Sequence, residues 1–166
     1  LIPGQTQPTQ KAFDTRIWTA LQAFDPAQPV YIESESKKVG NVVVPESLMS
    51  VMRSSPCLHL YLSEEERVKL LLEDYDFFVR DIAFFCDRLE ALTEARGKAV
   101  VADWQARAHQ GDVAGVVREL LTLHYDPVYL QSMQRNFEHY GAAKRLTPTD
   151  HSVQAMQALA ATLLAA

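Results

Sequence analysis

The most regular alternation of apolar and polar residues lies between residues 64 and 96. One row of apolar side chains recurs there at alternating intervals of four and three positions: Val68, Leu72, Tyr75, Val79, Ile82, Cys86 and Leu89. A second row repeats every seven positions beside it, at Leu71, Phe78, Phe85 and Leu92. A stripe of this width is typical of a helix inside a bundle. The pattern predicts one long helix over about 64–96, with a kink or break near its middle as the alternative. Ser63 and Glu66 form its capping box and Gly97 its stop.

Shorter stretches with helical spacing lie on both sides of this region. Cap and stop residues place these helices from Thr9 to Asp25-Pro26, from Pro45 to Arg53, and over about 113–125, 129–140 and 151–165. Asp112 and Asp150 are expected to cap two of them, and Asp126-Pro127 to end or bend the helix before it. The segment 141–149 is predicted to be a basic loop that contains Lys144-Arg145.

Two short apolar runs, 29–32 and 57–62, predict strands, and each is followed by a helix. This order is typical of a parallel sheet, yet two strands do not form a stable parallel sheet by themselves. The chain is therefore expected to be the back portion of a larger α/β domain. Residues 1–62 would belong to that domain, and residues 63–166 would form a mainly α-helical region.

Composition and charge narrow the classes of function. The chain has 166 residues, of which 48% are apolar and 22% charged, ordinary values for a folded domain. Acidic residues exceed basic ones by five, and the whole excess falls within 63–103. This balance lacks the positive field of an autonomous nucleic-acid binder, so RNA contacts would need local basic groups or another part of the protein, and DNA is not expected.

The sequence shows no run long enough for a membrane span and no signal-peptide pattern. Cys57 and Cys86 lie 29 positions apart and match no zinc motif, which favours reduced thiols in the cytoplasm. The five histidines are dispersed, so the sequence supports no metal centre. No glycine-rich phosphate loop is present either.

The densest group of polar side chains follows the predicted strand 29–32. It consists of Glu33, Ser34, Glu35, Ser36, Lys37 and Lys38. In open α/β sheets ligands bind at the carboxyl ends of the strands, and an acidic residue there can hold Mg²⁺ or orient water. The alternative is a solvated strand end with local ion pairs.

A second polar group lies near the start of the chain, at Gln5, Gln7, Gln10 and Lys11. Amide groups suit hydrogen bonds to bases or phosphates. The alternative is a loop and a helix start with no ligand. Arg53 precedes the second strand, where its guanidinium could fork onto an anion or lie on the surface without a partner.

Four segments, 7–15, 29–40, 44–57 and 123–129, resemble in their order the C-terminal region of bacterial tRNA 2-selenouridine synthases. The resemblance is close over 3–80 and looser over 81–140. Asp14 stands where that family commonly has Glu. The glycine-rich phosphate loop and the cysteine-bearing domain of the family lie outside these 166 residues.

The resemblance implies the fold and the reaction. The fold class is α/β, a partial P-loop-NTPase-like parallel sheet of few strands whose N-terminal half is absent, followed by a mainly α-helical region. A rhodanese-like domain with the catalytic cysteine would precede it, so neither Cys57 nor Cys86 receives that role. The implied enzyme replaces sulfur by selenium in the wobble 2-thiouridine of tRNA through a geranylated intermediate. Its implied co-substrates are selenophosphate and geranyl diphosphate, and residues 1–166 alone are expected to be inactive.

The resemblance also carries roles onto individual residues. Glu33 and Glu35 match the acidic strand end and would organise diphosphate or Mg²⁺, with Glu33 the candidate metal ligand. Ser36, Lys37, Lys38 and Arg53 are candidates for diphosphate binding. Gln7, Gln10 and Lys11 are candidates for contact with tRNA or substrate. Two other interpretations stay open: a fragment of a P-loop nucleotide kinase or NTPase, and a non-catalytic helical interaction module built on 64–96.

Overall fold

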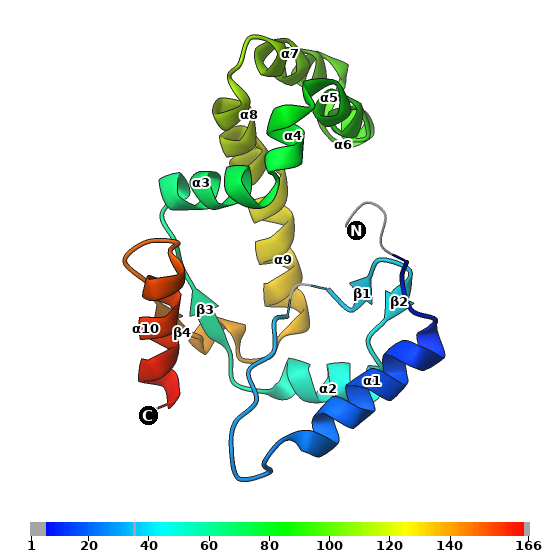
Figure 1. Cartoon of the computed structure of the whole chain (residues 1–166), viewed down its shortest axis with the longest axis vertical. Coiled ribbons are helices and arrows are strands. Elements are labelled where there is room, and N and C mark those ends of the chain that lie inside the picture. Colours follow the sequence, from blue (N-terminus) through cyan, green and yellow to red (C-terminus); the bar gives the residue numbers. More distant parts are fainter. Residues whose placement is uncertain (1–5, 35, 165–166) are drawn as a thin grey trace. The chain divides into compact units, whose positions relative to one another are not determined.

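The computed structural model describes residues 6–34 and 36–164. The chain forms two compact units. Unit 1 comprises Leu1–Cys57 and Gln131–Ala143, and unit 2 comprises Leu58–Leu130 and Lys144–Ala166 (Figure 1). The chain therefore leaves unit 1, builds most of unit 2, returns to unit 1 for one short stretch and ends in unit 2.

Unit 1 is built around a helix and a short hairpin. Helix α1 (Gln10–Ala23) begins at Thr9, whose hydroxyl accepts a hydrogen bond from the Ala12 amide at 3.2 Å, as predicted. Strands β1 (Lys38–Val39) and β2 (Val42–Val43) pair antiparallel, with Lys38 opposite Val43. Gly40 has a φ of 61° at the first of the two turn positions, a conformation that glycine adopts without strain. Gly40 and Asn41 therefore form the turn that joins the two strands.

Helix α2 (Glu46–Ser54) follows β2 and starts directly after Pro45, as predicted. Its Met49 is buried, together with Val42 of the hairpin and Met133 and Phe137 from the returning stretch. A 3₁₀ helix, η2 (Tyr140–Ala142), ends that stretch. The buried apolar set of the described part of unit 1 is therefore small.

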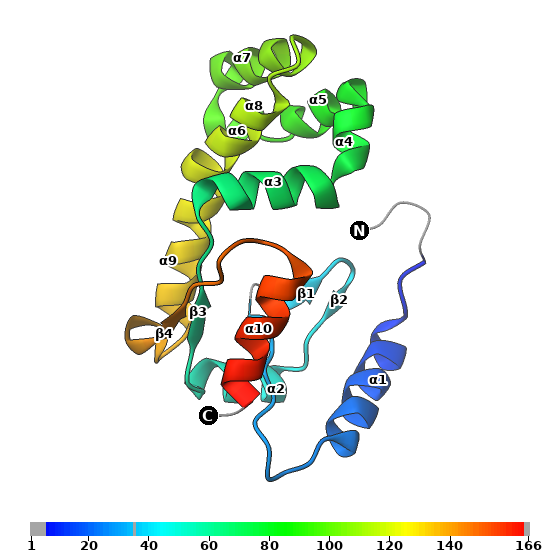
Figure 2. The ribbon, with the colours of Figure 1, turned by 60° about the vertical axis from the view of Figure 1, so that its left-hand side comes forward.

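Unit 2 is a group of short helices on a dense core. In chain order its helices are α3 (Glu64–Asp74), α4 (Asp76–Arg80), α5 (Ile82–Glu90), α6 (Thr93–Arg96), α7 (Lys98–His109), α8 (Val113–Leu120) and α10 (Val153–Leu164). The core joins α5, α7 and α8 and includes Phe85, Leu89, Val101, Trp104 and Val116. The helices α4 to α8 gather at one end of this unit in both ribbon views (Figures 1 and 2).

Unit 2 also holds a pair of strands from distant parts of the chain. β3 (Leu58–Leu60) runs parallel to β4 (Lys144–Leu146), with His59 opposite Arg145. The predicted strand at 57–62 is confirmed in its central residues. Its partner comes from the segment that was predicted to be a basic loop, so that prediction was wrong for 144–146.

The other predicted strand, 29–32, is not a strand in the structure. Val30, Tyr31 and Ile32 lie in irregular chain with about half of each side chain exposed. A strand needs a neighbour to satisfy its backbone groups. No segment of the described chain pairs with this run.

The predicted long helix over 64–96 is broken into four helices. Its cap at Ser63 is confirmed, because the hydroxyl accepts from the Glu66 amide at 3.3 Å. Tyr75 and Asp81 leave helical geometry, and the Asp81 carboxylate instead caps the next helix by accepting from the Phe84 amide at 2.9 Å. Asp competes for backbone amides in this way, which accounts for the break at Asp81, near the middle of the segment, where the alternative prediction had placed one.

The predicted helices 113–125 and 129–140 form one continuous run instead. α8 begins at Asp112, as predicted, passes into a π-helical turn, η1 (Leu121–Tyr125), and continues as α9 (Asp126–Asn136). Pro127 lacks an amide hydrogen and its ring crowds the carbonyl four residues before it, and the wider turn relieves both. The last helix begins after Ser152, whose hydroxyl accepts from the Ala155 amide, so Ser152 rather than Asp150 caps it.

None of the helices in 6–34 and 36–164 is long and apolar enough to cross a membrane.

Candidate functional site

The best-defined site in unit 1 lies between α1 and the β1–β2 hairpin. Gln7, just before α1, binds this hairpin with both ends of its amide group. Its Nε2 donates to the Val39 carbonyl at 3.0 Å, and its Oε1 accepts from the Asn41 amide at 2.5 Å. The side chain thus acts as a short piece of backbone along the hairpin turn.

Gln10 repeats this arrangement one turn later. Its Nε2 donates to the Val43 carbonyl at 2.8 Å and its Oε1 accepts from the Val43 amide at 2.9 Å. The same Nε2 also lies 2.7 Å from the Asp14 carboxylate. The two glutamines therefore join the start of α1 to both strands of the hairpin. Their predicted contact with tRNA or substrate stays a prediction, and Lys11, beside them, is exposed on α1.

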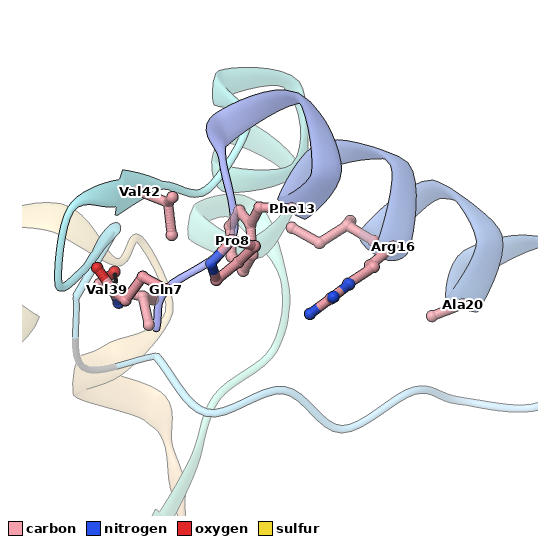
Figure 3. A pocket seen from close by; sticks show the side chains of 8 residues that line it. Gln7, Pro8, Phe13, Arg16, Ala20, Val39 and Val42 are labelled. Atoms are coloured by element: carbon pink, nitrogen blue, oxygen red, sulfur yellow. Dashed lines mark hydrogen bonds between the residues drawn. The ribbon is translucent and has the colours of Figure 1, made fainter. Parts of the chain in front are cut away.

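This junction borders an apolar groove of about 420 Å³ (Figure 3). The residues that line it are Gln7, Pro8, Phe13, Arg16, Ile17, Ala20, Val39 and Val42. Arg16 extends from α1 toward the hairpin residues in this view. Its guanidinium makes no ion pair with any residue of the described chain. The groove thus combines an apolar lining with one available positive charge, within the volume range of small-molecule sites.

Arg16 did not stand out in the sequence. It lies three positions after Phe13 and directly before Ile17, so helical spacing sets a cation beside the apolar stripe of α1. That proximity is the signal by which it could have been found. The hairpin that completes the groove has strands of only two residues each, too short for an apolar alternation to reveal.

The polar residues after 29–32 do not end a strand. Glu33 is exposed in irregular chain, and Ser34 lies beside Met133, with 3.7 Å between Oγ and Sδ. Glu35 lies outside the described residues. The Ser36 hydroxyl accepts from the Lys38 amide at 3.0 Å, which shapes the entry to β1. The strand-end geometry expected for these carboxylates is therefore not present in the described residues.

Two of the candidate cations converge on one carboxylate at the start of α2. Lys37 lies 3.9 Å from Glu46, and Arg53 lies 3.3 Å from the same side chain. The side chains of Lys37 and Glu46 are more than half exposed and that of Arg53 is about one third exposed, so these ion pairs contribute little to stability. The buried Nε of Arg53 has no hydrogen-bond partner among the described residues. Lys38 stands in β1 with its side chain exposed.

Other chemistry in the described part of the chain is sparse. No group of three His, Cys, Asp or Glu side chains there could hold a metal ion. Burial raises the pKa of the Cys86 thiol, which disfavours the thiolate needed for nucleophilic chemistry. Cys57 is partly buried, and its Sγ lies 3.7 Å from the Ser55 carbonyl.

Comparison with known proteins gives a consistent result. Residues 3–91 match a family model described as the tRNA 2-selenouridine synthase AAA domain. Over 71 residues the chain is 35% identical to a tRNA 2-selenouridine synthase of Marinobacter nauticus and 41% identical to one of Alcanivorax borkumensis. These alignments cover 42% of this chain and 19% and 20% of the two relatives, so the chain spans about a fifth of their length. No solved structure matches it.

Proposed function

The chain belongs to the tRNA 2-selenouridine synthase AAA domain family, and on that premise we propose that it is part of an enzyme that modifies tRNA. The reaction is the replacement of sulfur by selenium in wobble 2-thiouridine, through a geranylated thiouridine. Geranylation makes the sulfur a better leaving group. The observation that carries the proposal is the family match over 3–91, which includes the whole junction of α1 and the hairpin.

In this proposal the remaining parts of the enzyme come from other segments of a longer protein. A rhodanese-like domain supplies the selenium-handling cysteine, and a glycine-rich loop binds phosphate. The exposed apolar side chains of unit 1 support this, because Trp18, Phe24, Tyr31 and Ile32 are about half exposed or more. Apolar surface of that extent commonly marks an interaction site. The working location of such an enzyme is the cytoplasm, where tRNA is found.

We assign the groove between α1 and the hairpin to the co-substrate geranyl diphosphate. Its apolar lining suits the isoprenoid chain, and the Arg16 guanidinium suits the diphosphate, which it can bind through two parallel hydrogen bonds. Lys38 precedes Val39 in β1 and remains a candidate for diphosphate binding, but it does not line the groove. Ser36, Lys37 and Arg53 remain candidates for diphosphate binding, and Glu33 for Mg²⁺. Gln7, Gln10 and Lys11 remain the candidates for contact with tRNA or substrate.

The function is tested by grafting residues 3–91 into the Alcanivorax borkumensis relative in place of its matching segment. Selenophosphate, geranyl diphosphate and tRNA are supplied, and 2-selenouridine is measured by mass spectrometry of digested tRNA. We expect the folded graft to form 2-selenouridine. A folded graft that forms none, beside an active parent enzyme, would contradict the proposed function.

The groove is tested separately by binding to the 166-residue chain. Geranyl diphosphate should quench or shift the fluorescence of Trp18, which neighbours Ile17 on α1. Arg16→Ala should weaken binding about tenfold, the equivalent of one charge-assisted pair, and Arg16→Lys should restore part of it. Arg135→Ala, an exposed arginine elsewhere in unit 1, is the matched control. Stabilisation by ATP in place of geranyl diphosphate would favour the nucleotide kinase or NTPase interpretation.

A further inference from the structure

The parallel pair β3–β4 has two chemically different faces. Side chains alternate along a strand, so His59, Tyr61 and Arg145 project on one side, and Leu58, Leu60, Lys144 and Leu146 on the other. The ladder extends one residue beyond β3, because the Tyr61 amide donates to the Leu146 carbonyl at 2.8 Å. Backbone hydrogen bonds between the two strands therefore fix the positions of the residues that form the aromatic and basic face.

On this face a guanidinium stacks on an aromatic ring. The guanidinium carbon of Arg145 lies 3.6 Å from the centroid of the Tyr61 ring. Tyr61 is 40% exposed and Arg145 is exposed. The ring supports one side of the planar guanidinium and leaves the other side open to a ligand. Because the plane is already oriented, a ligand that stacks on it has less side-chain freedom to remove.

The positive charge on this strand pair is not neutralised by ion pairs. Neither Lys144 nor Arg145 pairs with an acidic side chain in residues 6–34 and 36–164. Residues 139–149 contain these two basic residues and no acidic one. In a chain with a net charge of −5, this segment is a local site of attraction for anions.

We propose that this face binds single-stranded RNA, with a nucleobase stacked on the outer side of the Arg145 guanidinium. Unpaired bases stack on aromatic and guanidinium planes, whereas a duplex keeps its bases stacked inside. The proposal rests on the proposed function, since the tRNA loop that carries the modified uridine is single-stranded RNA. It adds Arg145, a residue that lies outside the family match.

The test is the binding of a fluorescein-labelled single-stranded RNA to the 166-residue chain, measured by fluorescence anisotropy at several salt concentrations. Arg145→Ala should raise Kd about tenfold, because one base stack is lost. Arg145→Lys keeps the charge but loses the planar guanidinium, so its Kd should lie between those of the unchanged chain and Arg145→Ala. Tyr61→Phe keeps the ring and should bind as the unchanged chain does.

Lys144→Ala removes a charge from the other face of the strand pair, so it should change Kd by less than about twofold. Lys98→Ala, an exposed lysine on α7 in the same unit, is the matched control and should change Kd by less than about twofold. Circular dichroism confirms that each variant is folded. If Arg145→Ala unfolds the chain, Arg145→Lys decides the outcome, because it keeps the charge and the stem of the side chain.

The proposal would be overturned if the unchanged chain did not bind the RNA, or if Arg145→Ala and Lys98→Ala changed Kd equally. It would also be overturned if a fully paired RNA duplex bound equally well. Displacement of the RNA by a polyglutamate peptide at similar concentration would also overturn it, since the face would then bind any polyanion. A failed graft with intact RNA binding contradicts the proposed function alone. An active graft with Arg145-independent binding contradicts this inference alone.

Discussion

The two units of this chain are stabilised by different interactions. Unit 2 buries a continuous apolar cluster in which Trp104 and Val116 are 0% exposed. Unit 1 buries few apolar residues, and α1 buries none. Its helix α1 is instead joined to the hairpin by the side-chain amides of Gln7 and Gln10. Each amide donates one hydrogen bond to the hairpin backbone and accepts one from it.

This difference has an energetic consequence. Apolar burial stabilises in proportion to area, whereas a solvent-accessible hydrogen bond adds only about 1 kcal/mol net. Unit 2 should therefore resist unfolding by itself, and unit 1 should gain much of its stability from surfaces that cover its exposed apolar side chains. The predictions below test this contrast in order of expected effect.

The largest effect should come from the core of unit 2. Trp104→Ala removes a fully buried ring and the hydrogen bond from its Nε1 to Glu119, 2.9 Å long. We expect a loss of about 3–5 kcal/mol in the free energy of unfolding, measured by urea denaturation. Trp18→Ala is the control, because Trp18 is 63% exposed on α1. Equal losses for the two tryptophans would refute the contrast between the units.

The next effect should come from the hairpin turn of unit 1. Gly40→Ala forces a non-glycine residue to a φ of 61°, and its Cβ would clash with the side-chain amide of Gln7. We expect a loss of about 2 kcal/mol and faster hydrogen exchange at the amides of β1 and β2. Gly141→Ala in the same unit should be near neutral, since a Cβ there meets nothing within 4 Å. Unchanged hydrogen exchange in Gly40→Ala would show that the turn does not require glycine at this position.

Removing the side-chain amide of Gln10 should have a smaller effect. Gln10→Ala loses both hydrogen bonds to Val43, at a cost of about 1 kcal/mol for an exposed site. Hydrogen exchange at the Val43 amide should rise, while exchange in α7 and α8 stays unchanged. Gln28→Ala, an exposed glutamine in the loop after α1, serves as the reference. An equal rise in hydrogen exchange at the Val43 amide in Gln28→Ala would contradict the role assigned to Gln10.

The smallest effect should be the pH dependence of the contact between the C-terminal segment and α3. His151 Nδ1 lies 2.5 Å from Glu66 and Nε2 lies 3.2 Å from Glu73. These two carboxylates raise the pKa of His151 above its ordinary 6.5. Hydrogen bonds from Lys69 and then from His151 lower the pKa of Glu66 from 4.5 to about 2.

The sign of the effect follows from these two shifts. The raised pKa of His151 stabilises the fold fully below pH 6.5, and this contribution is lost as the pH rises through the raised value. The lowered pKa of Glu66 stabilises it above pH 4.5, and this is lost as the pH falls toward 2. The contact should thus be strongest between about pH 4.5 and 6.5. Thermal unfolding of His151→Gln should lose the alkaline part of this dependence, and His139→Gln should keep it.

Much of the local structure could be predicted from neighbouring residues. Thr9, Ser63 and Asp112 cap their helices, Gly40-Asn41 forms a turn and Gly97 stops a helix, as expected from each residue's own hydrogen bonds or φ. The Glu66 half of the predicted capping box did not form, because that carboxylate binds His151, 85 positions away. For the candidate site, the sequence predicted Gln7 and Gln10 but not the groove beside them. The groove is completed by Arg16 and the hairpin backbone, which come from separate segments of the chain.

By itself the sequence determined where α1, α2, α3 and α8 begin, which stripes are apolar, and the family to which residues 3–91 belong. These properties depend on contacts within a few positions or on matching motifs. Only the tertiary structure decided that 58–60 pairs with 144–146, that 64–96 breaks at Tyr75 and Asp81, and that Gln7 and Gln10 bind a hairpin. The reason is physical: strand partners and side-chain amide partners are chosen by which distant groups satisfy each other's hydrogen bonds, and no local pattern records that choice.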